Sequence, residues 1–144
     1  TPDGNTVGVI VNRPGERRLA ELMPGPHAER YAEPVFVGGP VLPDTLVALF
    51  QSPEPPAAPA FHVLRGVYLS MHPANVYPLV AQEDQRFRLY AGFSGWKPGQ
   101  LADEIAAGAW SIAAPSEEIV FRKDTRGLRR ELARPAEGQR TGWR

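Results

Sequence analysis

The chain reads RFRLYAGFSGWKPGQL at residues 86–101, and this stretch decides the fold class. Alternate residues from 87 to 93 are apolar, a period typical of a strand with one buried face. Residues 94–97 are predicted to turn. Pro98 suits the first turn of a helix that repeats apolar residues at 101, 105 and 109, with Gly108 as its terminator. The stretch therefore predicts a strand, a turn and a helix in succession.

Short β-branched or alternating runs predict further strands on both sides of it. They lie at residues 7–11, 35–37, 46–50, 61–64, 67–70, 110–113 and 119–121. Helical segments are predicted at 17–23, 73–80 and 124–133, and four prolines make 52–59 a surface loop. Because strands outnumber helices and the two kinds are interspersed, the 144 residues predict a single α+β domain.

Composition excludes several classes of site. The chain has no cysteine, which removes disulfides, a thiolate nucleophile and every cysteine-based metal centre. The three histidines, at 27, 62 and 72, show no metal-ligand spacing, so no metal and no cofactor is expected. No apolar run is long enough to span a bilayer and residues 1–12 show no signal-like pattern, so we expect a cytoplasmic protein without a membrane partner.

Net charge is zero, but its distribution is uneven. Residues 122–144 hold eight basic and three acidic side chains, a local balance of +5. In the predicted final helix, Arg126, Arg130 and Arg134 repeat every four residues and are the candidate contacts to nucleic acid. No helix-turn-helix is recognisable, so direct DNA binding would be salt-sensitive and sequence-blind. A solvated basic tail is the alternative.

Four motifs, taken together, resemble one bacterial family. They are Gly8–Pro14 (GVIVNRP), Val35–Val41 (VFVGGPV), Val67–Ser70 (VYLS) and Gly92–Leu101 (GFSGWKPGQL), followed by Glu104, Ile105 and Trp110. On these residues the chain is identified as a member of the AlgH/YqgE family. The resemblance implies an α+β fold on a curved, mostly antiparallel sheet with a few flanking helices, and a cytosolic bacterial protein. It implies no established reaction, cofactor or DNA-recognition motif, although members are commonly described as transcriptional regulators.

Family resemblance also suggests boundaries. Residues 1–121 are predicted to form the AlgH/YqgE-like domain, without the strand that the family carries before the Asp3-Gly4 turn, and residues 122–144 a basic helix and tail. Absence of that strand would expose a sheet edge, which predicts self-association. The chain also departs from the family at Ala102, where an acid is usual, and at Leu128, where an aromatic is common.

Loop ends supply the candidate binding surface. Asn12 and Arg13 end one predicted strand, Gly38 and Gly39 end another, and Ser94 and Gln100 flank the predicted turn. These six residues are the candidate site for a small-molecule ligand or a protein partner, because Arg13 suits carboxylate or phosphate and the turn before the helix offers backbone N–H groups. The alternative reading is structural: an arginine tied to loop carbonyls, and glycines that permit a tight turn.

No catalytic residue is assigned. Ser94 sits in a near match to the nucleophile elbow, but Trp96 replaces its second glycine and every histidine precedes the serine, against the order of an α/β-hydrolase. The sequence therefore favours a non-enzymatic regulator that acts indirectly through a ligand or protein. A small-molecule-binding protein, or an enzyme using the Arg13 and Ser94 loops, is the alternative.

Overall fold

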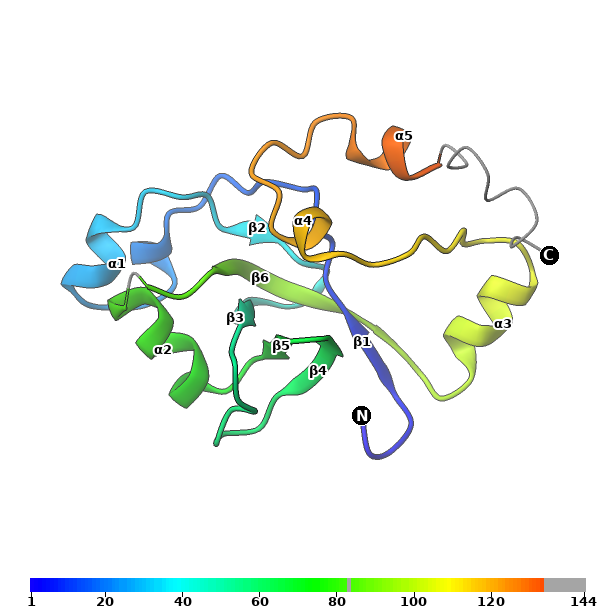
Figure 1. The fold of residues 1–144 in the computed structure, drawn as a ribbon, viewed down its shortest axis with the longest axis horizontal. Helices are drawn as coiled ribbons and strands as arrows, with labels where there is room; N and C mark the ends of the chain where they lie inside the picture. Colours follow the sequence, from blue (N-terminus) through cyan, green and yellow to red (C-terminus); the bar gives the residue numbers. More distant parts are fainter. Residues whose placement is uncertain (83, 134–144) are drawn as a thin grey trace.

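The computed structural model describes residues 1–82 and 84–133 and shows one curved, mostly antiparallel sheet with short helices around it (Figure 1). Its strands are β1 (Thr6–Gly8), β2 (Phe36–Val37), β3 (Val41–Gln51), β4 (Phe61–Leu64), β5 (Val67–Ser70) and β6 (Phe87–Trp96). The helices are a 3-10 turn at Leu19–Glu21, α1 (Pro26–Arg30), α2 (Pro73–Ala81), α3 (Gln100–Ala106), α4 (Glu117–Val120) and α5 (Leu128–Ala133). The α+β prediction is confirmed.

Strand order is β1-β6-β3-β5-β4, and every pair along that path is antiparallel. β2 adds a short parallel pair with β6. β1 therefore lies at one end of this strand order. Among the described residues, no helix has the length and apolar character needed to cross a membrane.

Both faces of the central strands β3 and β6 are buried. On one face, Leu46, Ala48 and Phe50 of β3 join Leu89 and Ala91 of β6 under the helices α1 and α2. On the other, Val47, Leu49 and Tyr90 pack with Phe36 and with Phe121, which follows α4. Figure 1 shows α1 and α2 together at one end of the sheet and α3 at the other. Double burial explains why the middle of each strand is apolar at consecutive positions.

The connection from β2 to β3 crosses over β6. Tyr90 and Ala91 pair with β2 along one edge of β6 and with β3 along the opposite edge. Residues 38–40 must therefore pass across the β6 backbone. A Cβ on Gly38 would overlap the carbonyl oxygen of Gly92, and a Cβ on Gly39 would overlap the backbone of Phe93. Only glycine lets the two backbones pass this closely.

Several segments differ from the prediction, and the first concerns the predicted turn at 94–97. Those residues continue β6 to Trp96 instead, because Ser94, Gly95 and Trp96 pair with β1. The turn comes later, and α3 starts at Gln100 after Gly99, whose φ is 78°. The strand predicted at 7–11 is correspondingly shorter, spanning Thr6–Gly8.

The two strands predicted after α3 are wrong. Residues 110–113 form no regular element, and the Trp110 ring instead meets the Trp96 ring edge-on at 5.9 Å. Residues 119–121 belong to the end of α4, because the Ser116 hydroxyl accepts a hydrogen bond from the Ile119 N–H at 3.2 Å and caps a helix there. Helix α1 was not predicted at all.

Other predictions are confirmed. Strands β4 and β5 lie at the predicted residues 61–64 and 67–70, and α2 covers the predicted 73–80. The final helix is shorter than predicted, spanning Leu128–Ala133. Leu128 and Thr125 are buried, so the described part of the basic segment packs on the domain.

The crossing predicts a steep steric cost at one glycine. Gly39→Ala should lower the free energy of unfolding by about 3 kcal/mol or prevent folding, because the added methyl group meets backbone that cannot move aside. Gly95→Ala, three residues beyond the crossing on β6, is the matched control, since its Cβ would meet only a Phe93 ring carbon at 4.0 Å. We expect a change of about 0.5 kcal/mol for it in urea unfolding. Equal losses in the two variants would contradict the crossing.

Candidate functional site

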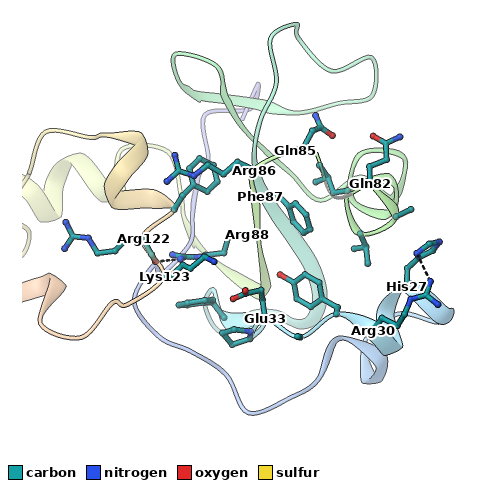
Figure 2. Close-up of a pocket in the computed structure, with 18 of the residues that line it drawn as sticks. His27, Arg30, Glu33, Gln82, Gln85, Arg86, Phe87, Arg88, Arg122 and Lys123 are labelled. Atoms are coloured by element: carbon teal, nitrogen blue, oxygen red, sulfur yellow. Dashed lines mark hydrogen bonds between the residues drawn. The ribbon is translucent and has the colours of Figure 1, made fainter.

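A cleft of about 890 Å³ opens at the end of the sheet where β6 begins (Figure 2). One wall is α1 with the residues that lead into β2, and a second is the end of α2. The third wall is α4 with the residues after it, and Arg86, Phe87 and Arg88 of β6 and its approach line the cleft between these walls. The cleft therefore gathers segments that are distant in sequence.

Cationic side chains dominate this lining. The lining has two carboxylates, Glu33 and Glu118, and five cations: Arg30, Arg86, Arg88, Arg122 and Lys123. His27 is also present, and its Nδ1 lies 3.4 Å from the Arg30 guanidinium. The cleft is consequently an electropositive concavity within a chain of zero net charge.

Arg88 has a structural part in this cleft. It is buried, its guanidinium lies 4.4 Å from the centre of the Phe36 ring, and it donates hydrogen bonds to the carbonyl oxygens of Val120 and Arg122. The cation thereby ties the segment after α4 to the sheet. Its donors are occupied by the protein itself, so Arg88 shapes the wall of the cleft.

Arg122 joins α4 to α5. Its guanidinium donates two hydrogen bonds of 2.7 Å to the Glu118 carboxylate and also binds Glu131. The Arg122 hydrogen bonds lower the pKa of Glu118, and the two carboxylates raise the pKa of Arg122. Both partners therefore stay charged at neutral pH, and this wall of the cleft is held by an ion-pair network.

Of the five cations that line the cleft, Arg30, Arg86 and Lys123 make neither an ion pair with another described residue nor the carbonyl hydrogen bonds that hold Arg88. Arg86 and Lys123 are exposed, and the Arg86 guanidinium lies over the Phe121 ring at 4.9 Å from its centre. This contact limits where the guanidinium can point while leaving its N–H groups free to donate. These three side chains are the ones that an incoming anion would meet.

Aromatic and amide groups complete the lining. Tyr31 stacks with Phe87, with 6.0 Å between ring centres, and both side chains are half-buried. Burial raises the pKa of Tyr31 to about 12, helped by the nearby Glu33 carboxylate. Gln82 and Gln85 add amide groups beside them. The cleft thus has an apolar ring surface next to its cations.

Just behind this lining, Tyr90 is buried in the second core. Its hydroxyl has no hydrogen-bond partner among the described residues. Burial raises the pKa of Tyr90 to about 12, against the lowering effect of the neighbouring Arg88 cation. The hydroxyl therefore stays protonated at neutral pH and acts as packing.

The loop-end residues predicted from the sequence lie outside the cleft. Three of them, Arg13, Gly38 and Ser94, make hydrogen bonds close to the crossing. The Val37 N–H donates to the Arg13 carbonyl at 2.8 Å, and the Ser94 hydroxyl donates to the Gly38 carbonyl at 3.4 Å. The side chains of Asn12 and Arg13 are exposed. Gly38 and Gly39 serve the crossing described above, whereas within the described residues no hydrogen bond ties the Arg13 guanidinium to a loop carbonyl.

Gln100 is separate from that cluster. Its Oε1 accepts a hydrogen bond of 3.0 Å from the Lys97 N–H at the start of α3. Neither Gln100 nor any other of the six predicted residues lines the cleft. A binding role for them stays a prediction.

The predicted nucleic-acid contacts are only partly available. Arg126 pairs with Asp124 at 2.7 Å, which lowers the pKa of that carboxyl to about 2, while Arg130 is exposed on α5. Arg134 lies outside the described residues. Over the described ranges, no group of three or more histidine, aspartate or glutamate side chains gathers as metal ligands would.

Sequence reasoning missed the cleft altogether. One signal was present: arginines occupy the alternate positions 86 and 88 of a strand whose other positions are apolar. The apolar alternation puts Arg86 and Arg88 on the face that the sequence predicts to be solvated, yet Arg88 is a buried cation and Arg86 lines the cleft. The remaining walls come from segments whose proximity only the fold creates.

Comparison with known proteins gives consistent results. The AlgH-like family, DUF179, matches residues 2–140. A UPF0301 protein of Thermobifida fusca is 34% identical over 154 residues, covering 96% of this chain and 75% of that protein. One from Myxococcus xanthus is 33% identical over 123 residues, covering 83% of this chain and 67% of that protein.

A solved structure agrees in fold. The solution structure of the AlgH protein from Pseudomonas aeruginosa matches with a TM-score of 0.72 at 22% identity. The match covers 92% of this chain and 73% of that one. At this identity the likeness concerns the arrangement of the sheet and helices.

Arg88 generates a stability prediction. Arg88→Met should keep the apolar contact with Phe36 but leave the carbonyls of Val120 and Arg122 without donors, lowering the free energy of unfolding by about 2 kcal/mol. Arg86→Met removes the same charge two residues away from an exposed position and should cost no more than about 1 kcal/mol. Urea unfolding of both variants measures the difference, and similar losses would refute the structural role of Arg88.

Proposed function

Since the chain belongs to the AlgH-like family, we propose that it is a non-catalytic regulatory protein of the bacterial cytoplasm that binds a small anionic ligand in the basic cleft. The observation that carries the proposal is the convergence of Arg30, Arg86 and Lys123, none of them ion-paired within the described residues, on one concavity. Unpaired cations beside a low-dielectric wall attract carboxylates and phosphates.

The dimensions of the cleft support a small ligand. Its volume of about 890 Å³ falls within the range of roughly 300–1,000 Å³ that is usual for small-molecule sites. Apolar rings on one side and a few charged groups on the other are the ordinary composition of such a site. A flat macromolecular interface would lack this concavity.

Binding is favoured over catalysis by the side chains present. The described residues that line the cleft include no serine, threonine or cysteine, so they supply no aliphatic hydroxyl or thiol nucleophile. His27 is the one imidazole among them, and it lies against the Arg30 cation. The enzyme alternative depends on Ser94, whose hydroxyl is directed to the Gly38 carbonyl outside the cleft.

An indirect mode of regulation follows from the state of the basic segment. Arg122 and Arg126 are engaged by carboxylates, and the described part of the segment holds one helix, the six-residue α5. Such a surface offers few phosphate contacts and no recognition helix of the usual kind. In this proposal, ligand binding changes the affinity of the protein for a protein partner.

Anion binding at the cleft is directly testable. Inorganic pyrophosphate and citrate, used as probes, should raise the thermal unfolding temperature of the 144-residue protein in a saturable way. The double variant Arg86→Ala with Lys123→Ala should weaken the apparent affinity by about tenfold or more, because two charge-assisted contacts are lost. Arg65→Ala, an exposed arginine on the β4–β5 turn, is the control outside the cleft. An equal effect of Arg65→Ala, or no stabilisation by either probe, would reject the site.

Direct DNA binding has its own test. Labelled duplex DNA titrated with the protein at about 50 and 200 mM salt should show weak, sequence-blind binding that the higher salt abolishes. The double variant Arg126→Ala with Arg130→Ala should reduce the low-salt binding only modestly. Tight binding to one sequence that persists at the higher salt and requires Arg130 would instead establish a direct regulator.

A further inference from the structure

The geometry points to a ligand class for the cleft: a phosphate that carries an aromatic heterocycle, as nucleoside monophosphates do. This inference rests on the proposed function, because it assigns the chemistry of the same site. Three features carry it, namely a ring surface, amide groups beside that surface and cations beyond it. Each feature suits a different part of such a ligand, and all three line one cleft.

Phe87 supplies the ring surface. Its side chain is half-buried, with Tyr31 stacked against it at 6.0 Å between ring centres, and it lines the cleft. The stacking partner and the core beneath hold the ring in place, so little side-chain entropy remains to be lost on binding. A half-buried, immobilised aromatic surface at a cleft favours planar heterocycles, whose stacking is tolerant of base identity.

Amide groups lie next to that ring. Gln85 donates from Nε2 to the Gln51 carbonyl at 3.3 Å, which leaves its Oε1 as an acceptor. Gln82 is exposed at the end of α2 and offers both a donor and an acceptor. Together they suit the polar edge of a heterocycle, which a purely aliphatic anion lacks.

Cations lie beyond the ring. In Figure 2 the Phe87 ring lies near the middle of the cleft, with Gln82 on one side and Arg86 and Lys123 on the other. Arg86 and Lys123 make no ion pair within the described residues, and two such cations match a phosphate of charge near −2 better than a single carboxylate. Arg86, positioned over Phe121, offers the planar N–H fork that phosphate oxygens accept.

The test compares whole ligands with their parts. Calorimetric titration of the full chain uses AMP, GMP, CMP and UMP, together with ribose 5-phosphate, inorganic phosphate and adenosine. At least one nucleotide should bind about fivefold or more tightly than ribose 5-phosphate, as stacking of one base provides. Adenosine, without phosphate, should bind more weakly than AMP.

Variants separate the ring from the charge. Phe87→Leu should remove most of the nucleotide advantage and leave ribose 5-phosphate binding unchanged, whereas Phe61→Leu, at an exposed phenylalanine on β4, should change neither. Gln82→Ala, at an exposed position, should also reduce nucleotide affinity and does not depend on core packing. It therefore tests the proposal even if Phe87→Leu does not fold.

The outcomes distinguish the two proposals. If ribose 5-phosphate equals every nucleotide and neither Phe87→Leu nor Gln82→Ala matters, the heterocycle is overturned while the anion site stands. If no phosphate compound binds and pyrophosphate is also without effect, the proposed function itself fails. If nucleotides bind but Arg86→Ala and Arg65→Ala weaken them equally, the binding is at another place and the assignment to this cleft is wrong.

Discussion

The structure depends on a contact between two backbones, where residues 38–40 cross β6 beside Gly92. β2 and β3 occupy opposite edges of β6 at Tyr90 and Ala91, so the connection between them has no other short path. A side chain at Gly38 or Gly39 would force the connection away from the β6 backbone. Because β3 and β6 are the two longest strands, their register, and with it both cores, follows from this crossing.

The crossing also positions the cleft. β2 pairs with β6 only at Tyr90 and Ala91, so the first residues of β6 extend beyond β2. There the Arg88 side chain binds the carbonyls of Val120 and Arg122, in the chain at the end of α4 and after it. That chain brings Phe121 into the second core and Lys123 to the rim of the cleft. On the opposite face Phe87 meets Tyr31. The alternation of one strand thus directs a structural cation to one side and a ring surface to the other.

The sequence could predict what is local. Alternation in 87–93, the proline-rich loop and the helix after Pro73 were readable because each pattern has one preferred conformation, and the family motifs added the curved antiparallel sheet. The two glycines at 38 and 39 were expected to permit a tight turn, but neither has a positive φ, and the β6 backbone that requires them lies more than fifty residues away. Residues 94–96 resembled a turn because local sequence does not show that they pair with β1, which is distant in the chain. At 119–121 a β-branched run was overridden by the Ser116 cap.

The cleft was not predicted because its walls come from segments that are distant in sequence. The roles of the motif residues and of the cleft residues in the fold also differ. At the crossing, the Arg13 carbonyl accepts from the Val37 N–H and the Gly38 carbonyl accepts from the Ser94 hydroxyl, and such positions are constrained by the fold whether or not a ligand exists. In the cleft, by contrast, Arg86 and Lys123 make no ion pair within the described residues, and the contact of Arg86 with the Phe121 ring leaves its N–H groups free. Arg88 and Arg122, which the fold does need, are already bound to carbonyls and carboxylates. The proposed recognition therefore rests on side chains that the fold leaves free, and Arg30, Arg86 and Lys123 are the ones among them that line the cleft.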